Sequence, residues 1–162
     1  LQNELIMEPE IITQPATKLV GISAQYNSAD LNLERLWSAF RPYRNSIANQ
    51  VGNDAFGIYE CYEEHDDDVS FSYICAVAVS NFEQIPKGMA TRELPEQLYA
   101  KFTHKGPIAN LDHTLKYIWG TWLPKSGYEY VEKPDFELYS PRLTPQGPER
   151  ILYLHIPVIK KS

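Results

Sequence analysis

The chain has 162 residues, of which 43% are hydrophobic and 22% are charged. This length and balance are typical of one globular domain with an ordinary core, and they exclude a disordered chain. The formal net charge is −6 and no dense basic cluster occurs, which argues against direct binding of nucleic acid and is compatible with a cationic partner.

The cysteine content and the short apolar runs predict a cytoplasmic protein. Cys61 and Cys75 are its two cysteines, too few for a disulfide scaffold, and we expect them to pack as thiols in a reducing compartment. No apolar run approaches the ~18–20 residues of a membrane span, and no signal peptide is recognisable. Without a zinc-spaced Cys/His cluster, a Walker loop or a GxGxxG loop, no metal and no cofactor is expected.

The first half of the chain begins, after a tail at residues 1–8, with a strand and a helix. The β-branched segment 17–26 predicts the strand. Apolar residues at helical spacing predict the helix, and Pro42 predicts a kink or an end near Arg41. That apolar stripe comprises Leu33, Leu36, Trp37, Phe40 and Ile47.

Two strands complete this half, at residues 56–62 and 69–79. The acidic run 63–68, which includes His65, joins them. It lacks the spacing and the glycine of an EF-hand loop, so a solvated hairpin is expected rather than a calcium site. Residues 81–91 are expected to form a loop.

The second half repeats this order of elements. A strand is predicted at 96–104, a turn at Lys105-Gly106-Pro107, and a helix at 108–122 that ends at Pro124 and Gly127. The apolar stripe of this helix comprises Leu111, Leu115, Ile118, Trp119 and Trp122. The last two strands are expected at 135–140 and 150–159.

The repeated order predicts an α+β fold with two strand-helix-strand-strand units, pseudo-twofold symmetry, and helices on one side of an antiparallel sheet. We expect one domain at 9–159, with half-repeats at about 9–80 and 90–159, and a tail at 160–162. A ligand groove is expected at the axis. Matching Ile58–Tyr62 with Asp135–Tyr139 makes Glu60 the counterpart of Glu137.

Glu137 lies in the middle of a predicted strand, on the same face as Tyr139 and opposite Phe136 and Leu138. One interpretation is that Phe136 and Leu138 face the core and Glu137 faces solvent. The other is that the second face is also covered and Glu137 lies at the bottom of an aromatic pit. A buried carboxylate is costly unless it is paired, so it would hold a proton or attract a cation.

Aromatic residues are abundant, with eleven Tyr, six Phe and three Trp. Trp119 and Trp122 lie on the apolar stripe of the second helix, where they either pack in the core or form an aromatic wall beside the groove. Aromatic faces near a carboxylate suit a lipophilic cation. The tyrosines in predicted strands that are candidates for such a wall are Tyr59, Tyr62, Tyr73, Tyr99, Tyr139 and Tyr153, and alternation along the strands places some of them on the surface.

Several motifs, in order, resemble the GyrI-like small-molecule-binding domain, which is also the effector-binding domain of AraC-type and MerR-type multidrug-responsive regulators. They are Leu94–Pro107, Trp122–Glu129, Phe136-Glu137-Leu138-Tyr139 and Ile156-Pro157-Val158. The resemblance spans about residues 9–159. Gln97 stands where the family usually has a glycine.

The resemblance implies that Glu137 is the pocket glutamate that contacts lipophilic cations, and that Trp122 is the tryptophan of the Trp-Leu-Pro motif. The other ligand-binding candidates are Trp119, Tyr73, Tyr153 and Tyr139. The predicted function is therefore binding of lipophilic cationic aromatic compounds, in multidrug sensing or resistance.

The resemblance also implies two other functions. Some stand-alone members hydrolyse cyclopropane-bearing genotoxins, and Glu137 would then be catalytic by positioning or activating a water. The family's namesake modulates DNA gyrase, so gyrase, a regulator or a second copy of the chain is a candidate protein partner. About 16 residues precede the first predicted strand, too few for a helix-turn-helix, so a stand-alone member or an excised domain is expected.

Overall fold

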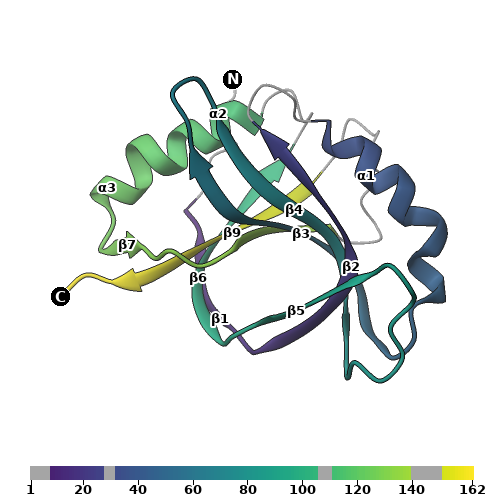
Figure 1. The fold of residues 1–162 in the computed structure, drawn as a ribbon. Coiled ribbons are helices and arrows are strands. Elements are labelled where there is room, and N and C mark those ends of the chain that lie inside the picture. The colour runs from purple at the N-terminus through teal and green to yellow at the C-terminus, as the bar shows by residue number, and fades with distance from the viewer. Residues whose placement is uncertain (1–7, 28–31, 106–110, 140–150) are drawn as a thin grey trace.

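The computed structural model describes residues 8–27, 32–105, 111–139 and 151–162, and its main feature is an antiparallel sheet that curls into a half-barrel (Figure 1). The strands are β1 (Glu10–Gln14), β2 (Thr17–Asn27), β3 (Gln50–Glu64), β4 (Val69–Val79), β5 (Ala90–Leu94), β6 (Gln97–Lys105), β7 (Tyr128–Tyr130), β8 (Asp135–Tyr139) and β9 (Ile151–Lys160). Their order across the sheet is β1-β6-β9-β8-β3-β4-β2-β5, and β7 pairs with β9.

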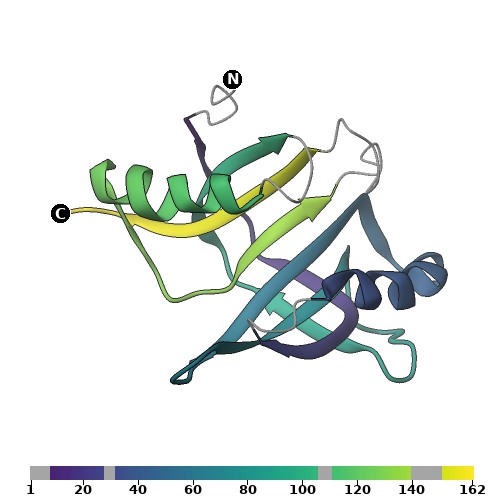
Figure 2. The same cartoon turned by 90° about the horizontal axis from the view of Figure 1, so that it is seen from above.

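Two helical segments lie on the outer side of the curl (Figures 1 and 2). The side chain of Asn32 caps α1 (Leu33–Phe40). A 3-10 helix follows at Arg41–Ser46, with Pro42 in its first turn. The second segment is α2 (Leu111–Tyr117), a π-helical turn at Ile118–Trp122, and α3 (Leu123–Lys125). In the part of the chain that the structure describes, no helix is long and apolar enough to cross a membrane.

The strand order is pseudo-symmetric. If β1, β2, β3 and β4 are exchanged with β5, β6, β8 and β9, the same strand order results when it is read from the opposite edge of the sheet. The register obeys the same exchange: the pair Gln14–Gln97 becomes the pair Leu94–Thr17 when each residue moves 80 positions along the chain. β1 of the first half pairs with β6 of the second half, and β5 pairs with β2, so each half supplies an edge strand to the other.

The predicted α+β fold with two pseudo-symmetric units is therefore confirmed, with three strands added. β1, β5 and β7 span five, five and three residues, too short to give a clear alternation of apolar residues. β5 lies at the end of the segment expected to be a loop, and the second helical segment continues through Pro124, because proline is tolerated in the first turn of a helix. The turn predicted at Gly106-Pro107 lies outside the described residues.

Apolar residues fill both faces of the sheet. A cluster inside the curl comprises Leu19, Phe56, Ile58, Ile74, Ala76, Leu94, Tyr99 and Phe136. Trp37 and Phe40 of α1 pack on the outer face over β2, β3 and β4. Ile118 and Trp122 pack on the outer face over β6 and β9. Residues of one strand thus alternate between the inner cluster and the two outer clusters.

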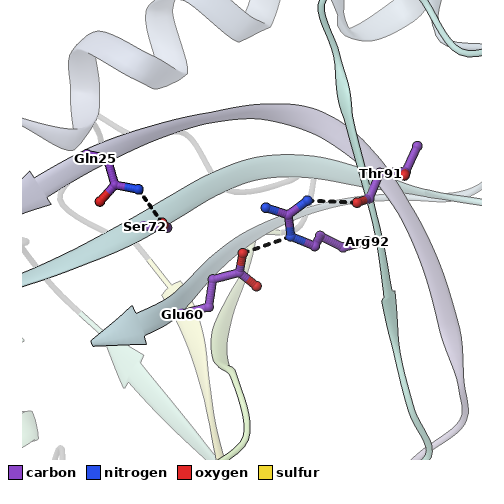
Figure 3. Close-up of polar contacts among 5 residues, drawn as sticks. All are labelled: Gln25, Glu60, Ser72, Thr91 and Arg92. Carbon is purple, nitrogen blue, oxygen red and sulfur yellow. Dashed lines mark hydrogen bonds and ion pairs between the residues drawn. The ribbon is translucent and has the colours of Figure 1, made fainter. Parts of the chain in front are cut away.

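An ion pair links two strands that are not neighbours in the sheet. Arg92 of β5 donates from Nε to Oε1 of Glu60 in β3 at 2.8 Å, and from Nη1 to the carbonyl of Thr91 at 2.8 Å (Figure 3). Nearby, Gln25 of β2 donates to the hydroxyl of Ser72 in β4 at 2.6 Å. The curl of the sheet brings β5 close enough to β3 for this contact, so Glu60 has a structural partner.

We expect Ile74→Ala to lower the free energy of unfolding by about 2–5 kcal/mol, because it leaves a cavity inside the curl, where Ile74 is 1% exposed. Urea unfolding followed by circular dichroism measures this change. Ile159→Ala is the matched control, since Ile159 is 49% exposed and its loss is expected to cost less than about 1 kcal/mol. Equal losses in the two variants would contradict the assignment of the inner core.

Candidate functional site

Glu137 lies at the seam between the two halves. Its strand β8 pairs with β3, and Glu137 is directly opposite Gly57. The side chain points to the outer face and only 4% of the residue is exposed. The structure therefore excludes the solvent-facing interpretation of Glu137 and supports the buried one.

Three tyrosine hydroxyls donate hydrogen bonds to the Glu137 carboxylate. Tyr59 of β3 donates to Oε1 at 2.5 Å, and Tyr139 of β8 donates to Oε2 at 2.7 Å. Tyr73 of β4 donates to Oε2 at 3.2 Å. Hydrogen bonds to a charged acceptor are stronger than neutral ones, so this ring of phenols offsets much of the cost of burying the carboxylate.

Trp37 orients one of these donors. Its indole Nε1 donates to the Tyr73 hydroxyl oxygen at 3.0 Å. Indole nitrogen is a donor only, so the Tyr73 proton is left to point toward Glu137. The chain from Trp37 through Tyr73 to Glu137 ties α1 to the seam.

Gly57 leaves the space that the Tyr73 hydroxyl occupies. A Cβ atom at position 57 would lie 2.0 Å from the hydroxyl oxygen of Tyr73 and 3.2 Å from Oε2 of Glu137. No side chain larger than hydrogen fits there without displacing Tyr73. The glycine is therefore part of the site although it contributes no functional group.

Aromatic rings surround the carboxylate on the side of α1. The ring of Trp37 is edge-on to Tyr139 at 5.0 Å, and Tyr59 packs against Phe71 at 5.5 Å and against Tyr73 at 4.9 Å. Burial, followed by the charge of Glu137, raises the pKa of Tyr59 and of Tyr73 well above that of free tyrosine. Both phenols therefore keep their protons and remain donors at neutral pH.

Asp135 provides a second carboxylate on the same face of β8, two residues before Glu137. Burial, and to a smaller extent the charge of Glu137, raises the pKa of Asp135 to about 7. The hydroxyl of Tyr62 donates to Oδ1 of Asp135 at 3.2 Å. This group is half-buried and lies nearer to solvent than Glu137.

A β-bulge allows Tyr62 to reach Asp135. The pairing of β3 with β4 shifts between Glu60 and Glu63, and Cys61 has a φ of 58°. In a regular strand Tyr59 and Tyr62 would point to opposite faces, but the extra residue restores Tyr62 to the face of Tyr59. Cys61 is exposed in this bulge and Cys75 is buried, and both are free thiols.

Trp119, a residue predicted for the site, packs on Tyr130, which interacts electrostatically with Asp135. Its ring is edge-on to Tyr130 at 5.1 Å and the residue is 40% exposed. Burial, followed by the charges of Asp135 and Glu132, raises the pKa of Tyr130. We call Asp135, Tyr62, Tyr130 and Trp119 the outer rim.

The structure does not place Trp122 and Tyr153 at the carboxylate. Trp122 packs on Phe102 in the core under the second helical segment, with ring centroids 5.1 Å apart. Tyr153 is paired with Leu138, on the opposite face of the sheet from Glu137, and Lys101 lies 4.6 Å over its ring. Tyr73 and Tyr139, by contrast, both contact Glu137.

Four contributors were not among the predicted site residues, namely Trp37, Gly57, Asp135 and Tyr130. The helical stripe indicates that Trp37 faces the sheet, but its spacing does not show which residue lies beneath it. Gly57 acts by its missing side chain, which no motif signals. In the described residues no three His, Cys, Asp or Glu side chains are placed to hold a metal ion.

The predicted equivalence of Glu60 and Glu137 is wrong. The pair Ala55–Tyr139 becomes the pair Asp135–Tyr59 when each residue moves 80 positions, and the same step carries Gly57 onto Glu137. The pseudo-symmetry thus exchanges Tyr59 with Tyr139, two phenols of the site, but gives Glu137 no acidic counterpart. Glu60 faces the inside of the curl, where Arg92 neutralises it.

A hollow of about 420 Å³ lies beside the aromatic rings, between the end of β2 and the start of α1. It is lined by Ala24, Gln25, Tyr26, Asn27, Asn32, Arg35 and Ser70. Tyr26 connects it with the site, because its ring packs on Phe71 and is edge-on to Tyr73. Glu137 itself is not in the wall of the hollow and is enclosed by the tyrosines.

Comparison with known proteins agrees with this arrangement. The family model of the GyrI-like small molecule binding domain matches residues 7–158. The chain belongs to the GyrI-like family. Transcriptional regulator BrlR of Pseudomonas aeruginosa is 29% identical to this GyrI-like domain over 154 residues, or 94% of this chain and 56% of BrlR. The chain thus spans about half the length of that curated relative.

Solved structures share the fold of this GyrI-like domain. EcmrR in an EcmrR–DNA complex superposes with a TM-score of 0.74 at 15% identity, over 98% of this chain and 59% of EcmrR. SAV2435, solved bound to tetraphenylphosphonium, gives a TM-score of 0.71 at 20% identity, over 94% of both chains. At these identities the likeness establishes the fold.

We expect Gly57→Ala in this GyrI-like domain to lower the free energy of unfolding by about 1–3 kcal/mol, because the new methyl group displaces Tyr73. Gly120→Ala is the matched control, since a Cβ there meets nothing within 4 Å and alanine favours helical backbone. Urea unfolding of both variants tests this. An unchanged midpoint for Gly57→Ala would show that Tyr73 does not need that space.

Asp135→Asn is expected to become more stabilising, relative to wild type, as the pH rises. Folding raises the pKa of Asp135 to about 7, so its favourable contribution is complete below about pH 4 and is lost as the pH rises through 7. Unfolding at pH 5 and pH 8 should show a relative gain of about 1–2 kcal/mol for the variant at the higher pH. Asp66→Asn in the exposed hairpin is the control, and the same gain there would refute the assignment to Asp135.

Proposed function

We propose that this domain binds lipophilic aromatic cations at Glu137. The observation that carries the proposal is a carboxylate that is 4% exposed and is held by three phenol hydroxyls among aromatic rings. In such a low-dielectric setting a carboxylate attracts a cation more strongly than it does at the surface. The three phenols donate hydrogen bonds to the carboxylate, and their rings offer aromatic faces to a cation.

Tyr59 and Tyr139 are the side chains that give way to a ligand. Both are half-buried, whereas Tyr73 is 0% exposed and is fixed by Trp37. Turning these two phenols outward opens the approach to Glu137 and leaves their rings beside the ligand. A cation over an aromatic face gains roughly 0.5–2 kcal/mol, so the displaced tyrosines continue to contribute.

Two comparisons support the proposal. SAV2435 was solved with tetraphenylphosphonium, a lipophilic cation with four aromatic rings. BrlR is a transcriptional regulator, so we extend the proposal to sensing of such compounds in the cytoplasm, within or beside a regulator. The sequence-based alternatives, hydrolysis of cyclopropane-bearing genotoxins and modulation of gyrase, stay predictions, because no contact among the described residues favours either.

Titration with tetraphenylphosphonium, read through tryptophan fluorescence, to which Trp37 beside the site contributes, tests the proposal. Wild type is expected to bind saturably, and Glu137→Gln is expected to weaken binding at least about tenfold, because it removes the buried charge and keeps the shape. Triphenylphosphine oxide is the neutral comparison ligand, and its affinity should change by less than about threefold.

Glu64→Gln serves as the matched control variant, since Glu64 is exposed at the end of β3. It removes one negative charge away from the site and should leave both ligands unaffected. Equal losses for the cation and the neutral compound in Glu137→Gln would contradict the electrostatic role. Absence of binding in wild type would overturn the proposed function.

A further inference from the structure

Resting on this proposed function, we infer that the site prefers dicationic aromatic compounds, with one charge at Glu137 and the second at Asp135 in the outer rim. The inner carboxylate would select for a cation on a flat aromatic body. The outer carboxylate would select for a second cationic group on a short arm. The ligand class thus becomes narrower than lipophilic cations in general.

The strand geometry sets the distance between the two charges. Asp135 and Glu137 are two residues apart in β8, so their side chains leave the same face of the sheet about 7 Å apart. Their hydrogen-bonding sets are separate: Tyr62 donates to Asp135 and the other phenols donate to Glu137. The two carboxylates are therefore held as two neighbouring acceptors and not as one shared site.

The outer rim has the character of a binding surface. Tyr62 is 47% exposed and Trp119 is 40% exposed, and they reach the rim from β3 and from the π-helical turn. Tyr130 of β7 backs Trp119. Tyr62 contacts the Asp135 carboxylate directly, and the charge of Asp135 reaches Tyr130, on which Trp119 packs. Partly exposed rings next to a carboxylate suit the recognition of a cation by charge and by ring face.

Asp135 has no cationic partner among the described residues. Among the ion pairs of residues 8–27, 32–105, 111–139 and 151–162 none includes Asp135, whereas Glu60, a carboxylate of similar burial, is paired with Arg92. The titratable groups that interact with Asp135 are acids and phenols: Glu137, Tyr62 and Tyr130 from the outer side, and Tyr99 from inside the curl, with Glu132 beyond Tyr130. A second cationic group would relieve the repulsion between the two carboxylates.

Ethidium and propidium form a matched pair of probes. Both contain the same singly charged phenanthridinium ring. In propidium a propyl arm that ends in a quaternary ammonium replaces the ethyl group and adds a second positive charge. Their charges do not titrate between pH 5 and 8. Any change in their relative affinity with pH therefore comes from the protein.

The experiment compares the two dissociation constants by fluorescence at fixed ionic strength. At pH 8 wild type is expected to bind propidium about tenfold more tightly than ethidium, and Asp135→Asn should reduce this ratio to about twofold or less while changing ethidium by less than about threefold. At pH 5.5 the wild-type ratio should fall toward that of the variant, because Asp135 is then protonated.

Two controls separate this inference from the proposed function. Glu129→Gln removes a charge from the exposed position beside Tyr130, and a loss of ratio equal to that of Asp135→Asn would reduce the effect to general attraction and overturn the inference. Tyr62→Phe keeps the carboxylate and tests the rim if Asp135→Asn unfolds: a retained ratio at pH 8 supports Asp135, and a ratio of one overturns it.

The remaining outcomes are distinct. If both dyes bind wild type and the ratio is unchanged in Asp135→Asn, the dication preference is wrong and the proposed function stands. If neither dye binds wild type, the proposed function falls and this inference falls with it.

Discussion

The carboxylate of Glu137 can be buried because a glycine faces it across the seam. β3 places Ala55 opposite Tyr139 and Gly57 opposite Glu137 of β8. With a side chain at position 57, Tyr73 would lose its place beside the carboxylate, and a buried charge with fewer donors costs several kcal/mol. The packing of α1 also depends on the space that Gly57 leaves, since Trp37 of α1 donates a hydrogen bond to the Tyr73 hydroxyl that occupies it.

The backbone is therefore nearly symmetric at the seam, whereas the side chains at the equivalent positions 57 and 137 differ. Two equal half-repeats would place two carboxylates in contact at the axis, and like charges in contact cannot both be ionised. This chain has glycine in one half and glutamate in the other. The tyrosines of the two halves keep their equivalence, so Tyr59 and Tyr139 approach the single carboxylate from two sides.

The sequence was sufficient for the fold, and it selected Glu137 as a candidate, but it did not reveal the surroundings of that residue. Periodicity predicted both helices and the longer strands, because amphipathic stripes are local. Glu137 was ambiguous by alternation alone, and the family resemblance favoured the buried interpretation. Trp122 and Tyr153 were misplaced relative to the carboxylate, because face assignment needs the register between strands.

The bulge at Cys61 shows the same limit most clearly. Regular alternation along the strand places Tyr62 on the face opposite Tyr59. The bulge at Cys61, with its positive φ, returns Tyr62 to the face of Tyr59. The equivalence of Glu60 with Glu137 failed for a related reason: similar sequence motifs were aligned by residue type, whereas the pairing of β1 with β6 and of β5 with β2 fixes the true offset.

The exchanged edge strands also determine how the domain can be divided. A chain cut in the connection between β4 and β5 yields two fragments, and the first fragment lacks β6, β5 and β8, the partners of β1, β2 and β3. Unpaired strand edges template association, so the fragments are complementary to each other. Each half supplies the strands that the other half lacks, so two separately expressed halves have complementary edges through which they can pair around Glu137.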